Sequence, residues 1–85
     1  MSHWEQRIGN IHNREDFARI VAAMADDLAH NPEGWENVSL AGFLGALAAF
    51  ALDLDGYFSN RGETVPDEPS WSLMAQMLLA ARIYE

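Results

Sequence analysis

The stretch that decides the fold is residues 39–58, SLAGFLGALAAFALDLDGYF. Its apolar residues recur three and four positions apart, as on one face of an α-helix: Leu40, Phe43, Leu44, Leu47, Phe50, Ala51, Leu54 and Phe58. The opposite face is apolar as well, since it carries Ala46, Ala48, Ala49 and Leu52. A helix that is apolar nearly all round is normally enclosed by other elements. We therefore expect this segment to be the central helix of the domain.

The remaining sequence predicts two further helices and a short lead-in. Asn13, Ser39 and Ser70 are residue types that cap helices, and they precede the apolar patterns of 14–30, 40–59 and 71–83. Residues 1–12 predict an N-terminal arm, irregular or briefly helical, that lays Trp4 on the core. Three main helices joined by short turns predict an all-α fold, a small antiparallel helical bundle forming a single domain over 1–85.

Two features of this bundle stay open. The second helix ends either at Gly56 or near Asn60, and we favour the longer version because Tyr57 and Phe58 continue the apolar stripe. Two helices that are apolar nearly all round also exceed what a three-helix bundle covers. Either Trp4 and the loops shield the surplus, or two copies pack together as a homodimer.

The chain is acidic, with thirteen Asp and Glu residues against five basic residues, and its formal net charge is −8. This charge disfavours nucleic acid and anionic membranes as partners, and it favours a basic protein partner if the acids cluster. The longest apolar run, 43–52, is about ten residues and too short to span a bilayer. Residues 1–5 lack the features of a secretory signal, so we expect a cytoplasmic protein.

No motif predicts an enzyme, a cofactor or a metal. Residues 53–56, Asp-Leu-Asp-Gly, resemble the start of a calcium loop, but the glycine comes too early and Thr64 stands where the loop needs a glutamate. The three histidines are far apart, which does not support zinc. The chain has no cysteine, and Ser39 and Ser70 serve as caps, so no side chain is placed as a nucleophile.

Asp53 and Asp55 are unusual because acids near a helix C-terminus oppose the helix dipole. Two positions apart on a helix, they point about 200° apart and make a poor catalytic pair. One interpretation is that Arg14 of a neighbouring helix offsets them. The other is that they form an acidic recognition patch, since a local rule broken without compensation marks a functional site.

The second half of the chain resembles a group of small bacterial proteins of unknown function. The resemblance covers roughly residues 35–85 and rests on four short patterns: Trp35-x-Asn37-x-Ser39-Leu40, Asp55-Gly56-Tyr57, Ser70-Trp71 and Ile83-Tyr84-Glu85. It implies a bacterial, cytoplasmic, helical domain and assigns no site residue.

Three functions remain compatible with these residues. The first is a non-enzymatic protein-interaction domain, such as an immunity or antitoxin-like inhibitor of a basic partner, which uses Trp35, Asp53, Asp55 and Tyr57 as its contact. The second is a structural homodimeric subunit whose interface is the surplus apolar surface. The third is small-molecule binding in an aromatic-lined pocket between Trp35, Trp71 and Tyr57.

Overall fold

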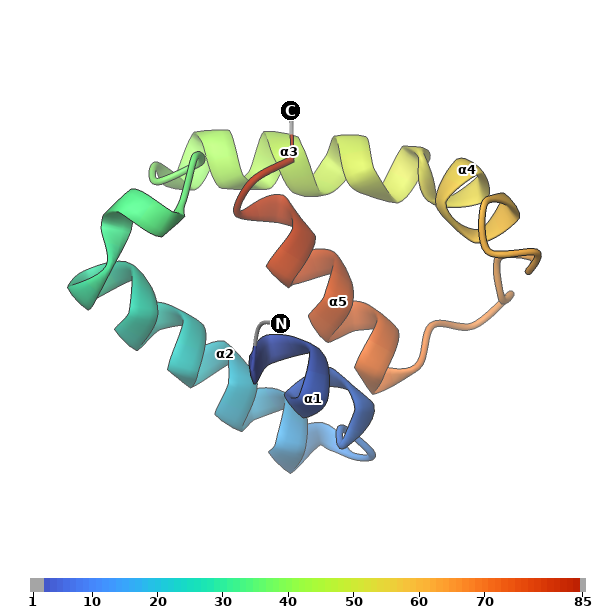
Figure 1. Ribbon diagram of the computed structural model, residues 1–85, viewed down its shortest axis with the longest axis horizontal. Helices are drawn as coiled ribbons and strands as arrows, with labels where there is room; N and C mark the ends of the chain where they lie inside the picture. The colour runs from blue at the N-terminus through green and yellow to red at the C-terminus, as the bar shows by residue number, and fades with distance from the viewer. Residues whose placement is uncertain (1–2, 85) are drawn as a thin grey trace.

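The computed structural model describes residues 3–84, with side chains described from residue 4 onward. Glu85, the last residue of the Ile-Tyr-Glu pattern, and residues 1–2 of the expected arm lie outside these described residues. Within them the chain has only helical regular structure (Figure 1): α1 (His3–Gly9), α2 (Arg14–His30), the 3₁₀ turn η1 (Pro32–Gly34), α3 (Leu40–Leu52), α4 (Leu54–Ser59) and α5 (Trp71–Ala81). The predicted all-α helical bundle is therefore confirmed.

Three helices begin directly after the residues that the sequence predicted as their caps: Asn13, Ser39 and Ser70. In each case the side-chain oxygen accepts the backbone N–H three residues further on, at 2.8, 3.0 and 3.0 Å. These bonds satisfy amide groups that the first turn of a helix leaves without a partner. The starts of the main helices are thus set by local sequence.

The single helix expected over 40–59 is wrong, because the chain breaks at Asp53 (φ −92°, ψ 7°) into α3 and α4. The Asp53 amide donates to the carbonyls of both Ala49 and Phe50 at 3.1 Å, so the last turn of α3 is tightened. α4 ends at Ser59, so helical structure does end near Asn60, as the longer alternative predicted. Gly62 follows in the turn, and its φ of 72° suits only glycine without strain. The third helix, expected over 71–83, ends at Ala81.

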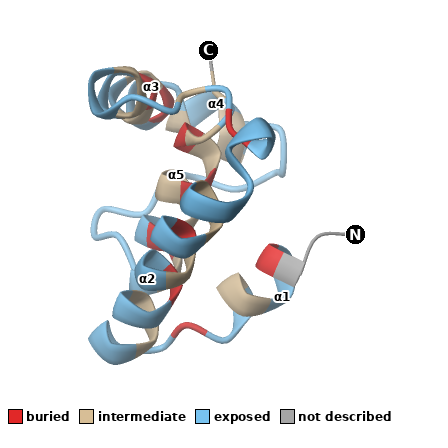
Figure 2. Cartoon of the chain, turned by 90° about the vertical axis from the view of Figure 1, so that its left-hand side faces the viewer, coloured by how far each residue is buried: buried red, intermediate tan, exposed pale blue. Residues whose placement is uncertain are grey.

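The central helix is α5, and the expectation that residues 39–58 are enclosed is wrong. α5 packs against α1, α2 and α3, and its Ala75 and Ala81 have no exposed surface at all. α3 packs on α5 along one side only and lies at the edge of the molecule (Figure 2). Small side chains let three helices approach α5 closely, so it takes the middle position although both helices are apolar.

α2 and α5 run in the same direction, so the expected antiparallel arrangement does not hold for this pair (Figure 1). Phe17 and Trp71 meet near the starts of the two helices, with ring centroids 5.4 Å apart. Trp35 and Arg82 meet just after their ends, with the guanidinium 5.8 Å from the indole. The segment from α4 through residues 61–70 carries the chain back to the end where α2 began, and this reverses the expected direction.

The core lies between α1, α2 and α5. Its buried members are Trp4, Ile11, Ile20, Met24, Trp35, Ala75 and Leu79. The N-terminal arm is helical as α1, and it buries Trp4 as the sequence predicted. The Ser72 hydroxyl holds this helix in place by donating to the Ile8 carbonyl at 2.9 Å. None of the helices in the described part of the chain has the length and apolarity that crossing a bilayer requires.

Candidate protein-interaction site

An acidic hollow lies where α3 ends and α4 begins. It measures about 380 Å³ and is lined by Phe50, Asp53, Asp55, Gly56, Tyr57 and Tyr84. We call these six residues the acidic hollow. Asp53, Asp55 and Tyr57 were predicted from sequence as site residues, and the structure brings the three of them together here.

The wall of the acidic hollow is a cluster of three aromatic rings. Phe50 is buried, and the rings of Tyr57 and Tyr84 stand edge-on to it with centroid distances of 5.6 and 5.2 Å. Tyr84 follows α5 in sequence and reaches the site only through the packing of α3 on α5. Sequence reasoning missed Tyr84 and Phe50, because nothing local links position 84 to position 53.

The two carboxylates of the acidic hollow have no cationic partner among the described residues. Asp53 accepts a hydrogen bond from the Tyr84 hydroxyl, and this bond raises the pKa of Tyr84. Asp55 is exposed. Arg14, which was expected to offset one of these acids, instead pairs with its neighbour Glu15 at 3.3 Å. The interpretation in which Arg14 compensates the acids is therefore wrong. The premise that Asp55 opposes a helix dipole is wrong as well, because Asp55 lies in the first turn of α4, where a carboxylate is favourable.

Trp35 lies apart from the acidic hollow, at the opposite end of α3. It is buried, its ring packs 6.0 Å from that of Phe43, and its Nε1 donates to Asp27 at 2.8 Å. The guanidinium of Arg82 lies between its ring and that of Trp4, and burial there lowers the pKa of Arg82. These contacts make Trp35 a structural residue that joins α2 to the end of α5, not a member of the expected contact.

The aromatic-lined pocket expected between Trp35, Trp71 and Tyr57 does not form. Trp35 is buried at the start of α3, Trp71 packs on Phe17 at the start of α2, and Tyr57 belongs to the acidic hollow. The three rings lie at different places in the bundle, because each belongs to a different helix end: Trp35 before α3, Trp71 at the start of α5 and Tyr57 in α4.

The side of α3 that faces away from α5 is apolar and exposed. We call it the α3 outer face, and it consists of Leu40, Ala41, Leu44, Gly45, Ala48, Ala51 and Leu52. Leu40, Leu44 and Leu52 expose 73, 52 and 83% of their surface. No charged or polar side chain interrupts it. The sequence predicted a surplus of apolar surface but did not place it on α3, because residues 39–58 were expected to be enclosed.

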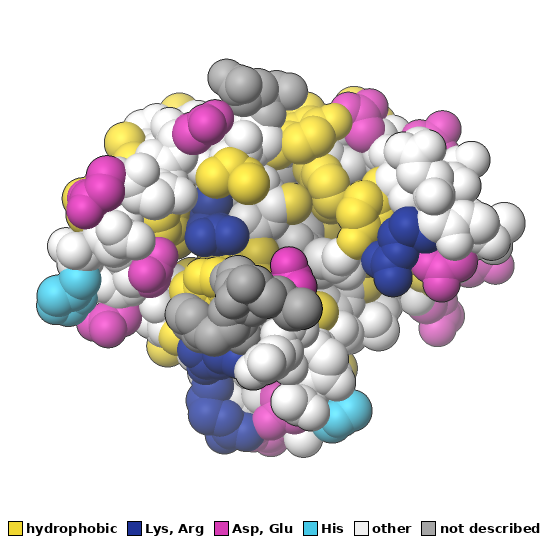
Figure 3. Space-filling view, viewed as in Figure 1, with side chains coloured by type: hydrophobic (Ala, Val, Ile, Leu, Met, Phe, Trp, Pro, Cys, Tyr) yellow, Lys and Arg dark blue, Asp and Glu magenta, His cyan; other side chains and the backbone are white. Residues whose placement is uncertain are grey.

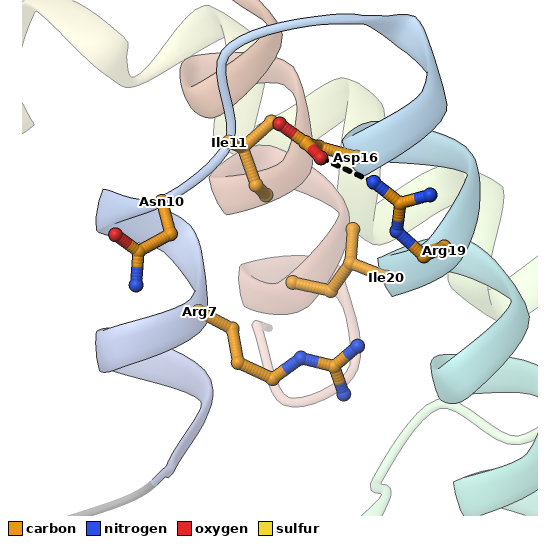
Figure 4. A pocket seen from close by; sticks show the side chains of 6 residues that line it. All are labelled: Arg7, Asn10, Ile11, Asp16, Arg19 and Ile20. Atoms are coloured by element: carbon orange, nitrogen blue, oxygen red, sulfur yellow. Dashed lines mark hydrogen bonds and ion pairs between the residues drawn. The ribbon is translucent and has the colours of Figure 1, made fainter.

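A further hollow of about 170 Å³ lies between α1 and α2 (Figure 4). Arg7 extends into it from α1, while Arg19 on α2 pairs with Asp16 at 2.5 Å. The Asp16 carboxylate also accepts the backbone N–H of His12 at 3.0 Å, and mainly through this bond its pKa is lowered. Asp16 thus neutralises Arg19 and also holds the backbone before α2, so we assign these contacts a structural role.

The helices and the acidic hollow define a small all-α helical-bundle domain with an acidic, aromatic-lined surface site. The chain belongs to the family of unknown function DUF7660, which matches residues 13–85. This match confirms the resemblance to a family of unknown function. No curated protein and no solved structure matches the chain.

Proposed function

We propose that this chain is a non-enzymatic protein-interaction domain that binds a basic partner protein through the acidic hollow, in the manner of an immunity or antitoxin-like inhibitor. The observation that carries the proposal is the pair of carboxylates, Asp53 and Asp55, that stand beside aromatic rings and form no ion pair with a cation of the described chain. The net charge of −8 supports it, because such a surface steers a basic partner toward encounter.

The chemistry of the hollow suits an arginine side chain of the partner. A guanidinium donates to carboxylates through a planar set of N–H groups and stacks on aromatic rings. The chain shows this pairing on Tyr57 itself. Arg61 lies 5.4 Å from the centre of the Tyr57 ring and donates to its hydroxyl at 2.9 Å. A partner arginine in the hollow gains the two carboxylates in addition.

The surface of the chain combines acidic and apolar side chains. On the face shown in Figure 3, acidic side chains lie scattered over the surface, with hydrophobic side chains reaching the surface between them. Aromatic anchors inside an acidic rim are a combination found at protein-protein interfaces, where charge sets the rate of encounter and the buried rings hold the complex.

The test is a ¹⁵N chemical-shift titration of the full chain with a short blocked peptide that contains two arginines. We expect saturable shifts at residues 53–57 and 84. Asp53→Asn combined with Asp55→Asn should weaken binding about tenfold, the upper part of what two exposed ion pairs contribute. The matched control is Asp67→Asn with Glu68→Gln, two exposed loop acids that change the net charge by the same amount.

The control decides between a site and a general charge effect. We expect the Asp67 and Glu68 variant to bind within about twofold of the wild type, because exposed charges at a distance are screened. Equal weakening in both double variants, or shifts spread over all acidic residues, contradicts the proposal.

A further inference from the structure

We propose that the α3 outer face binds a second copy of this chain, so that two molecules form a two-fold symmetric dimer with α3 packed against α3. This surface is separate from the acidic hollow and goes beyond the proposed function.

The chain exposes more surface than a compact monomer of its size. Its accessible surface is 5706 Å², whereas a folded monomer of 9.5 kDa exposes about 5,050 Å². The excess is thus about 650 Å² per chain, near the roughly 800 Å² that each partner buries in a stable interface of ordinary size. This excess, taken over the whole chain, is comparable to the area that one partner of a dimer buries.

The chemistry of the α3 outer face fits a copy of itself. A two-fold axis places the same surface on both partners. Any charged residue at the centre of such a surface would meet its own like charge. The α3 outer face carries no charge, although the chain has a net charge of −8. A basic heteropartner has no complementary group here, because the carboxylates of the acidic hollow lie beyond the end of α3.

The shape of the face allows two helices to approach closely. If the chains pair antiparallel about the middle of α3, Leu44 of one copy lies across from Ala48 of the other, and Leu40 lies across from Leu52. Leucine then meets alanine on either side of the axis, where the helices approach most closely, and leucine meets leucine at the two ends of the contact. Gly45 lies near the centre of the face, and a side chain at this position would project into open space. Packing within one chain therefore does not require a glycine here.

An apolar groove extends this face toward α2. It measures about 340 Å³ and lies between α2 and the start of α3, with Leu40 belonging to both the groove and the α3 outer face. Its apolar lining includes Val21, Met24 and Phe43. Leu52 of the second copy arrives beside this groove in the antiparallel arrangement, so the groove adds contact area at each end of the interface.

The test is sedimentation velocity of the full chain over protein concentrations from about 1 to 100 µM, the range of ordinary association constants. The wild type should shift from one to two times 9.5 kDa. Leu44→Arg should raise the dissociation constant at least about tenfold, since it sets two like charges across the axis. The matched control is Val65→Arg, an exposed loop residue of similar class, which should change the constant less than about twofold.

A second variant and a change of salt concentration test the dimer independently of Leu44→Arg. Leu52→Arg alters a residue that is 83% exposed, so it leaves the monomer folded and should also prevent dimer formation. Raising salt from about 50 to 500 mM should tighten the dimer by screening the two net charges, while it weakens binding of the arginine peptide. A wild type that remains monomeric throughout, or a dimer that forms equally in all three variants, overturns the proposal.

The dimer and the proposed function fail independently. Leu44→Arg should leave the arginine-peptide titration unchanged, and the Asp53 and Asp55 double variant should leave the dimer mass unchanged. A variant that abolishes both would show that the two surfaces are one, which contradicts the separation proposed here.

Discussion

Replacing Leu79 by alanine should destabilise the protein far more than the same replacement at Leu52. The two leucines belong to helices of similar apolar composition, yet Leu79 on α5 is 7% exposed and Leu52 on α3 is 83% exposed. Truncation of a buried leucine costs about 2–5 kcal/mol. Exposed substitutions stay within about 0.5 kcal/mol. The difference in unfolding free energy between the two variants therefore shows which of the two helices is enclosed.

The free energy lost in Leu79→Ala is large compared with the total stability of the domain. A domain of 85 residues has a total stability of about 4–13 kcal/mol, so Leu79→Ala removes a substantial part of it. Urea unfolding followed by tryptophan fluorescence measures the effect, and the midpoint should fall by more than about 1 M. Both replacements are made in the Leu44→Arg background, so that association does not contribute. Equal losses, or a greater loss at Leu52, would refute the assignment of α5 as the central helix.

Three further predictions concern single polar contacts. Asn37→Ala removes two bonds of 2.9 Å from its side chain to the carbonyls of Ala81, the last residue of α5, and of Tyr84 beyond it, and thermal unfolding should show a loss of about 1–3 kcal/mol. Asp16→Asn should lower the urea midpoint at neutral pH. Because the pKa of Asp16 is depressed below its ordinary 3.8, its contribution is present above that pH and is lost as pH falls through the folded pKa, so variant and wild type should converge in acid. Asp53→Asn should lower the pKa of Tyr84 toward its ordinary value, measured by ultraviolet absorbance in an alkaline titration, because the hydrogen bond that raises it is lost.

The helix starts could be predicted from sequence because they depend on neighbours in the chain. Each cap acts on an amide three residues away, so Asn13, Ser39 and Ser70 carry the information themselves. The break at Asp53 could not be predicted in this way. The apolar stripe continues through Tyr57 and Phe58, and the tightened turn that divides it leaves no pattern in the sequence.

The choice of central helix needed long-range information. Apolar periodicity shows which residues favour burial, and both α3 and α5 satisfy it. The structure separates them through Ala75 and Ala81, whose lack of exposed surface marks the place where other helices reach α5. Helix direction likewise depended on the path of residues 61–70, which is irregular and carries no directional signal.

The candidate site could be predicted in part. Asp53, Asp55 and Tyr57 are close in sequence and were identified together. Trp35 could have been excluded, since it precedes a helix whose far end leads to Tyr57, and thirteen helical residues span about 20 Å. Tyr84 could not have been found, because only the packing of α3 on α5 brings it to Asp53.

The central claim is that α5 is enclosed while the outer face of α3 is bare in a single chain. Solvent paramagnetic relaxation of leucine methyl groups in the monomeric Leu44→Arg variant tests it most directly. With a soluble gadolinium chelate, the methyl signals of Leu40 and Leu52 should broaden strongly, and those of Leu73 and Leu79 should stay sharp. Protection of Leu40 and Leu52 equal to that of Leu79 would contradict the account.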